Sequence, residues 1–355
     1  MRNVRKVVLE ILTVVLIAWS GGVTAAAQEG VHVIPEFTFE SGAKLQNMKV
    51  GYVTHGTLNQ VKSNAILVTH GSGGNRNSYN VFIGPGKALD TDRYFVVAVD
   101  AIGGGNSSSP KDGLGIEFPR YTIRDMVHAQ HDLVTKGLGL TGLLALGGPS
   151  MGSFQAVEWG IQYPGFAKGL LLIVPSGSFN PVLAPVIDTM VAVMQLDPDW
   201  NGGRYTRNPT EGLKRAGMVF FPWIWSDEWL ATLKTQEEYE KALSAPGEGF
   251  SNWDATSWMY RYLASRNHDV ARPFAGNLDL ALSKITSKAL IMPSVSDRLV
   301  PPHLARLLSH GIKQATYREI PSIAGHMGGA PRDEKSMEYV FISAQIKEFL
   351  DGLTQ

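Results

Sequence analysis

Short apolar segments alternate with helical patterns along most of this chain, and this alternation restricts the fold more than any other feature. Glycine, proline or polar residues bound each segment, as is typical of strands buried on both faces of a sheet. These predicted strands are Ala65–Thr69, Tyr94–Val99, Leu143–Leu146, Gly169–Val174, Ala289–Met292 and Thr316–Ile320, after extended segments at His32–Glu40 and Met48–Val53. Helical patterns cover Ile123–Lys136, Met151–Tyr163, Pro302–Gly311 and Glu334–Leu350. The alternation predicts an α/β fold with a mostly parallel sheet flanked by helices.

One long stretch interrupts the alternation and predicts an insertion. Residues 178–283 show no convincing strand and hold six of the eight tryptophans: Trp200, Trp223, Trp225, Trp229, Trp253 and Trp258. We interpret this stretch as a helical cap on one core domain formed by residues 28–177 and 284–355. Cap aromatics are expected mostly to pack the cap's own core, although some could line an apolar acyl pocket.

The N-terminus has the pattern of a signal peptide. Arg2, Arg5 and Lys6 precede the apolar run Val7–Trp19, and Ala25–Ala27 offers an A-x-A cleavage site. We therefore expect residues 1–27 to be removed and the protein to be exported, either to the periplasm or as a secreted protein. An uncleaved amphipathic N-terminal helix is the alternative.

Composition excludes several classes of site and partner. Lys+Arg and Asp+Glu are both 32, and loss of residues 1–27 would leave a net charge of −2, so nothing indicates nucleic acid or a charged membrane. The chain has no cysteine, which excludes disulfides and cysteine-based metal sites. We expect a small-molecule substrate, no cofactor and no stable membrane insertion after signal cleavage. A homodimer stays open, because the sequence says nothing about oligomeric state.

The strongest local motif is a G-x-S-x-G pattern between a predicted strand and a predicted helix. Gly147-Gly148-Pro149-Ser150-Met151-Gly152 contains this pattern, follows the strand LLAL directly and precedes the next helical segment. In this context the serine lies on a tight strand-to-helix turn that projects its hydroxyl, and the glycines let the backbone pass closely. Ser150 is therefore the candidate nucleophile.

A serine nucleophile needs a base and a carboxylate that orients the base. Asp297 follows the predicted strand ALIM, and His326 follows the last predicted strand. Taken singly, Asp297 could cap the next helix and His326 could be an ordinary loop histidine. The order Ser150, Asp297, His326, with the insertion between serine and aspartate, is that of the α/β-hydrolase fold. We predict a catalytic triad.

Acyl transfer through this triad also needs donors for an oxyanion. One should be the backbone N–H of Met151. The other should come from the glycine-rich segment after strand AILVT, with Ser72 preferred and Gly71 or Gly73 as alternatives.

Two other patterns are set aside. Gly103–Gly105 lacks the G-x-G-x-x-G spacing of a dinucleotide turn. His128 and His131 lie three apart on one predicted helix, but no nearby third residue completes a metal site.

Several long stretches resemble the homoserine O-acetyltransferase family of α/β hydrolases. They are Phe82–Pro110, Phe118–Gln130, Gly147–Trp159 and Ser296–Pro302. The resemblance places the family's catalytic residues on Ser150, Asp297 and His326. It also implies acyl-enzyme chemistry with an acyl-CoA donor.

The departures from the family concern the donor and the acceptor. Met327 follows the catalytic histidine where the transferases have aspartate, and Gly217 and Asn252 stand where the family has arginines. Loss of these guanidinium groups weakens the case for binding an amino-acid carboxylate. Export would also separate the enzyme from cytoplasmic acetyl-CoA. We therefore expect hydrolysis of an ester or amide, with an acyltransferase as the alternative and a non-catalytic binding protein as a third class.

Overall fold

The computed structural model describes residues 27–354, and these residues form one eight-stranded sheet. The strands are β1 (Gln28–Thr38), β2 (Lys44–His55), β3 (Ala65–Val68), β4 (Phe95–Val99), β5 (Leu143–Pro149), β6 (Ala167–Ile173), β7 (Lys288–Met292) and β8 (Ala315–Tyr317). Their spatial order is β1-β2-β4-β3-β5-β6-β7-β8. The β1–β2 and β2–β4 pairs are antiparallel, and the pairs from β4 to β8 are parallel. The predicted mostly parallel sheet is confirmed.

Alternating side chains of the central strands build a core on each face of the sheet, as the two-residue period of a strand requires. Leu170 and Leu172 of β6 belong to the core that includes α1 (Ile123–Asp132), α2 (Met151–Gln162) and α9 (Pro302–Gly311). Leu171 and Ile173 belong to the opposite core, where α10 (Met337–Thr354) contributes Ile342 and Ile346. Helices therefore cover both faces, which explains why the strands read as continuous apolar runs.

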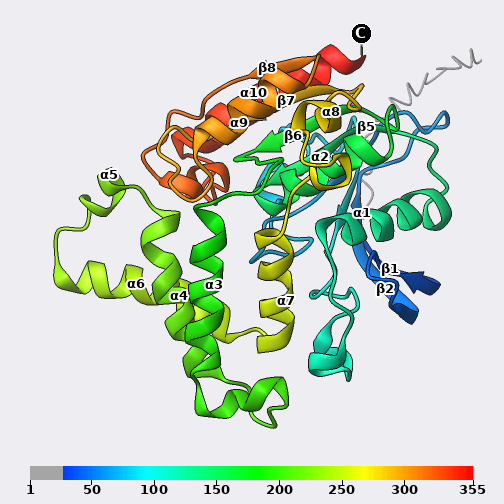
Figure 1. Cartoon of the computed structure of the whole chain (residues 1–355). Helices are drawn as coiled ribbons and strands as arrows, with labels where there is room; N and C mark the ends of the chain where they lie inside the picture. The colour runs from blue at the N-terminus through cyan, green and yellow to red at the C-terminus, as the bar shows by residue number, and fades with distance from the viewer. Residues whose placement is uncertain (1–26, 355) are drawn as a thin grey trace, which may run out of the picture.

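Only helices and irregular segments lie between β6 and β7. The α-helices there are α3 (Leu183–Gln195), α4 (Thr210–Ile224), α5 (Asp227–Leu230), α6 (Gln236–Ser251), α7 (Ala255–Arg266) and α8 (Leu278–Leu282). Figure 1 shows α3, α4, α6 and α7 grouped beside the sheet, while α8 lies near α9. We call residues 178–283 the cap.

Most aromatic residues of the cap pack on one another. Trp258 is fully buried and lies 5.3 Å from Phe250 and 5.1 Å from Tyr262 between ring centroids. Trp225 stacks on Trp229 at 3.7 Å. These rings bury the apolar surface of short helices that could not form a core alone.

The ends of several elements differ from the predicted ones. The predicted helix Ile123–Lys136 is an α-helix only to Asp132 and continues as a π-helical turn over Leu133–Gly137, where the Leu138 N–H donates to the Leu133 carbonyl. The last helix begins at Met337 instead of Glu334 and runs to Thr354. Local hydrogen bonds of this kind are poorly encoded in apolar periodicity.

The predicted signal peptide falls almost wholly on residues 1–26, which lie outside the described residues. Strand β1 begins at Gln28, directly after the predicted cleavage position. Between residues 27 and 354, no helix has the length and apolar character needed to cross a membrane.

Candidate active site

Ser150 occupies a strained turn between β5 and α2. Its φ of 55° and ψ of −121° lie in a region that side-chain-bearing residues rarely adopt. The turn passes close to the end of β3, because a Cβ on Gly148 would lie 1.9 Å from the Thr69 carbonyl oxygen. Glycine is therefore required at position 148. This close passage lets the turn present the Ser150 side chain at the carboxyl end of the sheet.

The structure brings Ser150, His326 and Asp297 into one hydrogen-bonded chain. His326 Nε2 lies 2.9 Å from Ser150 Oγ, and His326 Nδ1 lies 2.7 Å from Asp297 Oδ2. Because the carboxylate can only accept, Nδ1 carries the proton and Nε2 is free to accept from the serine hydroxyl. This is the geometry that a general base for a serine nucleophile needs.

The Asp297 carboxylate is held by the backbone around it. Its side chain is fully buried, and Oδ1 accepts from the N–H groups of Leu299 and Val300, both at 2.9 Å. Oδ2 is left to accept from His326. Asp297 therefore keeps its orientation without help from the substrate.

Three hydroxyl groups hold the loop that carries His326. Ser296, beside Asp297, donates to the Ser322 carbonyl at 2.6 Å and accepts from the Gly325 N–H at 3.0 Å. Ser322 donates to Glu338 of α10 at 2.5 Å. Ser226 in the cap donates to the Ile323 carbonyl. The histidine loop is thus tied to the aspartate loop, to α10 and to the cap.

The candidate oxyanion donors lie on the two segments that flank Ser150. Met151 is the first residue of α2, so its backbone N–H has no acceptor within the helix. In the other segment, a Cβ on Gly71 would lie 3.6 Å from Ser150 Cβ. Among the described residues, the N–H groups of Gly71, Ser72 and Gly73 have no hydrogen-bond partner. Each of the three is therefore a candidate for the second oxyanion donor.

Residues 64–329 match the alpha/beta hydrolase fold family. A homoserine O-acetyltransferase of Methanohalobium evestigatum is 33% identical over 333 residues, which cover 82% of this chain and 68% of that protein. The chain belongs to the homoserine O-acetyltransferase-like family of α/β hydrolases. The family predicted from the sequence is confirmed.

Solved structures that are similar to this chain include a hydrolase and a transferase. An acetylester hydrolase from Corynebacterium glutamicum has a TM-score of 0.85 and 27% identity, covering 91% of this chain and 96% of that chain. The homoserine O-acetyltransferase from Bacillus anthracis has a TM-score of 0.83 and 26% identity, covering 92% and 98%. The likeness supports an enzyme of the α/β-hydrolase superfamily.

Neither position that lacks the family's arginine presents a cation to the triad. Gly217 of α4 packs directly on α6, and a Cβ at this position would lie 2.2 Å from the Gly247 nitrogen. Asn252 is exposed, and its amide donates to the Glu248 carbonyl. No side chain fits at position 217 with the helices this close.

The residues set aside in the sequence have structural contacts of their own. His128 Nε2 lies 2.8 Å from Gln162 Oε1, while His131 stacks on Tyr163 at 3.8 Å. Gly105 turns against Asp100, whose carboxylate would lie 2.2 Å from an added Cβ. Residues of both patterns therefore have packing or hydrogen-bonding roles within the fold.

Two residues near the triad carried no sequence signal. Arg261 of α7 is fully buried and donates to the Gly74 carbonyl at 2.8 Å and the Ala101 carbonyl at 3.2 Å. His70 is buried beneath the same segment, and burial lowers its pKa to about 4. Neither belongs to a motif, and only the fold places the cap helix over the loop after β3.

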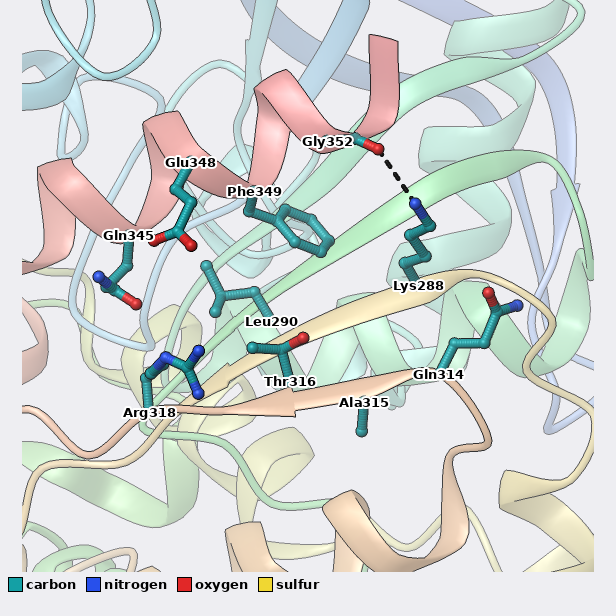
Figure 2. Close-up of a pocket in the computed structure, with 10 residues that line it drawn as sticks. All are labelled: Lys288, Leu290, Gln314, Ala315, Thr316, Arg318, Gln345, Glu348, Phe349 and Gly352. Carbon is teal, nitrogen blue, oxygen red and sulfur yellow. Dashed lines mark hydrogen bonds between the residues drawn. The ribbon is translucent and has the colours of Figure 1, made fainter. Parts of the chain in front are cut away.

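An open groove lies elsewhere, between α10 and the edge of the sheet at β7 and β8 (Figure 2). It has a cavity volume of about 400 Å³. Lys288 and Ala315, the first residues of β7 and β8, line it. The triad residues follow the opposite, carboxyl ends of β5, β7 and β8, so the groove is separate from the candidate active site.

Proposed function

We propose that this protein is a serine hydrolase that cleaves an ester or amide of a small organic substrate through an acyl-enzyme, with a carboxylic ester as the preferred substrate. The observation that carries the proposal is the continuous hydrogen-bonded chain from Ser150 Oγ through His326 to Asp297. The similarity to the acetylester hydrolase from Corynebacterium glutamicum supports hydrolysis of acetyl esters.

The proposed reaction has two halves. Ser150 Oγ attacks the acyl carbon while His326 Nε2 takes its proton, and the buried Asp297 carboxylate stabilises the resulting imidazolium. The Met151 amide and one amide of the segment after β3 hold the oxyanion. His326 then protonates the departing alcohol. Water attacks the acyl-enzyme with His326 again as base, which releases the acid and restores Ser150.

Water is the favoured acceptor because a site for an amino-acid carboxylate lacks its cations. Gly217 and Asn252 replace the arginines of the family's transferases, and the α4–α6 contact excludes a side chain at position 217. Arg261 does reach the segment after β3, but its Nη atoms donate to backbone carbonyls. A bidentate guanidinium contact has no substitute in glycine or asparagine.

The hydrolase proposal is tested by supplying water and homoserine as competing acceptors of the acyl group. We expect turnover of p-nitrophenyl acetate in water, with release of acetate unchanged by added homoserine. A second reaction mixture contains acetyl-CoA and homoserine in place of the ester, and mass spectrometry detects any O-acetylhomoserine formed. Formation of O-acetylhomoserine faster than ester hydrolysis would refute the proposal.

The second candidate is an acyltransferase that uses an acyl-CoA donor. It is favoured by the sequence relatives named homoserine O-acetyltransferase, such as the 33% identical protein of Methanohalobium evestigatum. The same triad would serve both reactions, because they differ only in the acceptor for the acyl group.

Export of the protein is a further part of this proposal. It is supported by the basic residues before Val7–Trp19 and by the start of β1 at Gln28, so that cleavage near Ala27 leaves the sheet complete. We expect cells producing the full chain to release a mature protein from the cytoplasm whose N-terminal sequence begins near Gln28. Full-length protein with intact Met1 confined to the cytoplasm would contradict export.

A further inference from the structure

The loop after β3 contains one carbonyl that fixes the direction of a candidate oxyanion amide. The Gly71 carbonyl accepts from the Gly74 N–H at 2.9 Å and lies 2.8 Å from His70 Nδ1. This carbonyl shares its peptide unit with the Ser72 N–H. In a planar trans peptide the two groups point in opposite directions, so whatever holds the carbonyl also aims the amide.

The hydrogen bonds of His70 determine which of its nitrogens carries the proton. Nε2 lies 3.1 Å from the backbone nitrogen of Ala101, which can only donate. Nε2 must therefore be the acceptor, and Nδ1 carries the proton that it donates to the Gly71 carbonyl. Burial, with a smaller contribution from the Arg261 charge, lowers the pKa of His70 to about 4, so the ring is neutral at neutral pH.

The order of the strands decides on which side the Ser72 amide lies. Strand β3 has β4 on one side and β5 on the other. Ala101, which binds the His70 ring, follows β4, whereas Ser150 follows β5. The Gly71 carbonyl binds this ring, whose other nitrogen binds the residue after β4. The Ser72 N–H, on the opposite edge of a planar peptide, should then point to the other side, toward β5 and Ser150.

The cap holds the far end of the same loop. Arg261 donates to the Gly74 carbonyl and to the carbonyl of Ala101, the residue whose N–H binds His70. The Ser72 hydroxyl lies 2.8 Å from the Ser265 hydroxyl of α7. These contacts leave the loop little freedom to turn its peptide groups.

From these contacts we propose that His70 is a positioning residue that aims the backbone N–H of Ser72 at the oxyanion. Ser72, not Gly71 or Gly73, is then the second donor beside Met151. His70 touches neither the substrate nor Ser150 and acts only through the Gly71 carbonyl. The inference rests on the proposed acyl-enzyme chemistry, since only a reaction with an oxyanion uses this amide.

Two replacements of His70 separate its two hydrogen bonds. In His70→Asn the amide nitrogen takes the place of Nδ1 and can still donate to the Gly71 carbonyl. In His70→Gln the longer side chain places its amide near Nε2, so the bond to Ala101 survives and the donor to Gly71 is lost. Removal of a complete oxyanion donor costs about 100-fold to 1000-fold in kcat.

We therefore expect His70→Gln to lower kcat and kcat/KM for p-nitrophenyl acetate together, by about 10-fold to 100-fold, as a misaligned donor should. His70→Asn should stay within a few-fold of the wild type. Affinity for trifluoroacetophenone, which forms an oxyanion on Ser150, should fall in parallel with kcat/KM. Equal kcat/KM in the two variants, or unchanged affinity for the ketone, would overturn the proposal.

A matched control separates positioning from simple loss of a buried ring. His268 is also buried, and its Nε2 lies 3.1 Å from the Ser176 carbonyl. His268→Asn should lower the midpoint of thermal unfolding while leaving the affinity for the ketone near that of the wild type. A loss of ketone affinity as large as that of His70→Gln would mean that His70 has only a structural role.

A crystal structure of the wild-type enzyme labelled with a fluorophosphonate tests the geometry even if the variants do not fold. We expect a phosphonyl oxygen within about 2.7–3.1 Å of the Ser72 nitrogen. An oxygen bound by Gly71 or Gly73 instead would overturn the proposal. Labelling of Ser150 in an enzyme that hydrolyses no ester would refute the proposed function alone, because the position of the oxygen would still decide the role of His70.

Discussion

Ser150→Ala should lower kcat for p-nitrophenyl acetate on the order of a millionfold, because the variant loses the atom that forms the acyl-enzyme. The 2.7 Å hydrogen bond between His326 and Asp297 does not involve the Ser150 hydroxyl, so we expect it to remain in the variant. The remaining rate would come from the oxyanion donors and from binding alone. The measurement is kcat for the purified variant, with the wild type titrated by a fluorophosphonate to count its active sites.

Ser153 provides a matched serine for this experiment. It lies in the first turn of α2, is fully buried, and donates to the Ser150 carbonyl at 2.7 Å. Ser153→Ala removes a hydroxyl of equal size at nearly the same place, and we expect at most about a tenfold loss, consistent with one net hydrogen bond of ~1 kcal/mol. Wild-type turnover in Ser150→Ala would show that this serine is not the nucleophile.

Asp297→Asn should lower kcat by about 10,000-fold while leaving the fold intact, because backbone N–H groups fix the orientation of this side chain. Oδ1 of Asp297 accepts from the N–H groups of Leu299 and Val300. An asparagine keeps these bonds only with its oxygen in that place, so its NH₂ group faces His326. His326 must then accept at Nδ1 and carry its proton on Nε2, where it cannot take the proton of Ser150.

Steady-state kinetics with p-nitrophenyl acetate measures this effect, and circular dichroism shows that the variant is folded. Asp197→Asn is the control, because Asp197 is also buried and accepts backbone N–H groups from Asp199 at 2.9 Å and Gly212 at 2.7 Å. It lies in the cap, so its replacement should lower the free energy of unfolding and leave kcat nearly unchanged. A loss below about tenfold in Asp297→Asn would contradict an orienting role for the carboxylate.

The candidate triad was accessible from the sequence because each member belongs to a local pattern. Ser150 lies in a G-x-S-x-G motif at a strand-to-helix junction, and Asp297 and His326 each follow an apolar strand. Parallel strands end at the same edge of a sheet, so residues that follow different strands can meet there. The structure places these three residues together, 2.9 Å and 2.7 Å apart at the contacting atoms.

His70 and Arg261 could not be identified in this way. His70 was visible only as one letter of a glycine-rich segment, and Arg261 only as one cation of the cap. Their roles depend on hydrogen bonds to backbone carbonyls of residues brought near by the fold. Every residue has such a carbonyl, so the residue types alone do not show which one a side chain contacts. The same holds for Gly217, whose contact with Gly247 joins two helices of the cap.

The amino-acid sequence by itself determined the alternation of strands and helices, the family, and the three residues of the candidate triad, because each of these depends on short-range patterns and their order. The tertiary structure alone decided the strand order that joins Ser150 to His326 across 176 positions. It also decided the strained turn at Ser150 and the contacts of the Gly71 carbonyl with His70 and Gly74. These properties depend on which peptide groups face one another, and long-range packing of the sheet and cap sets that arrangement.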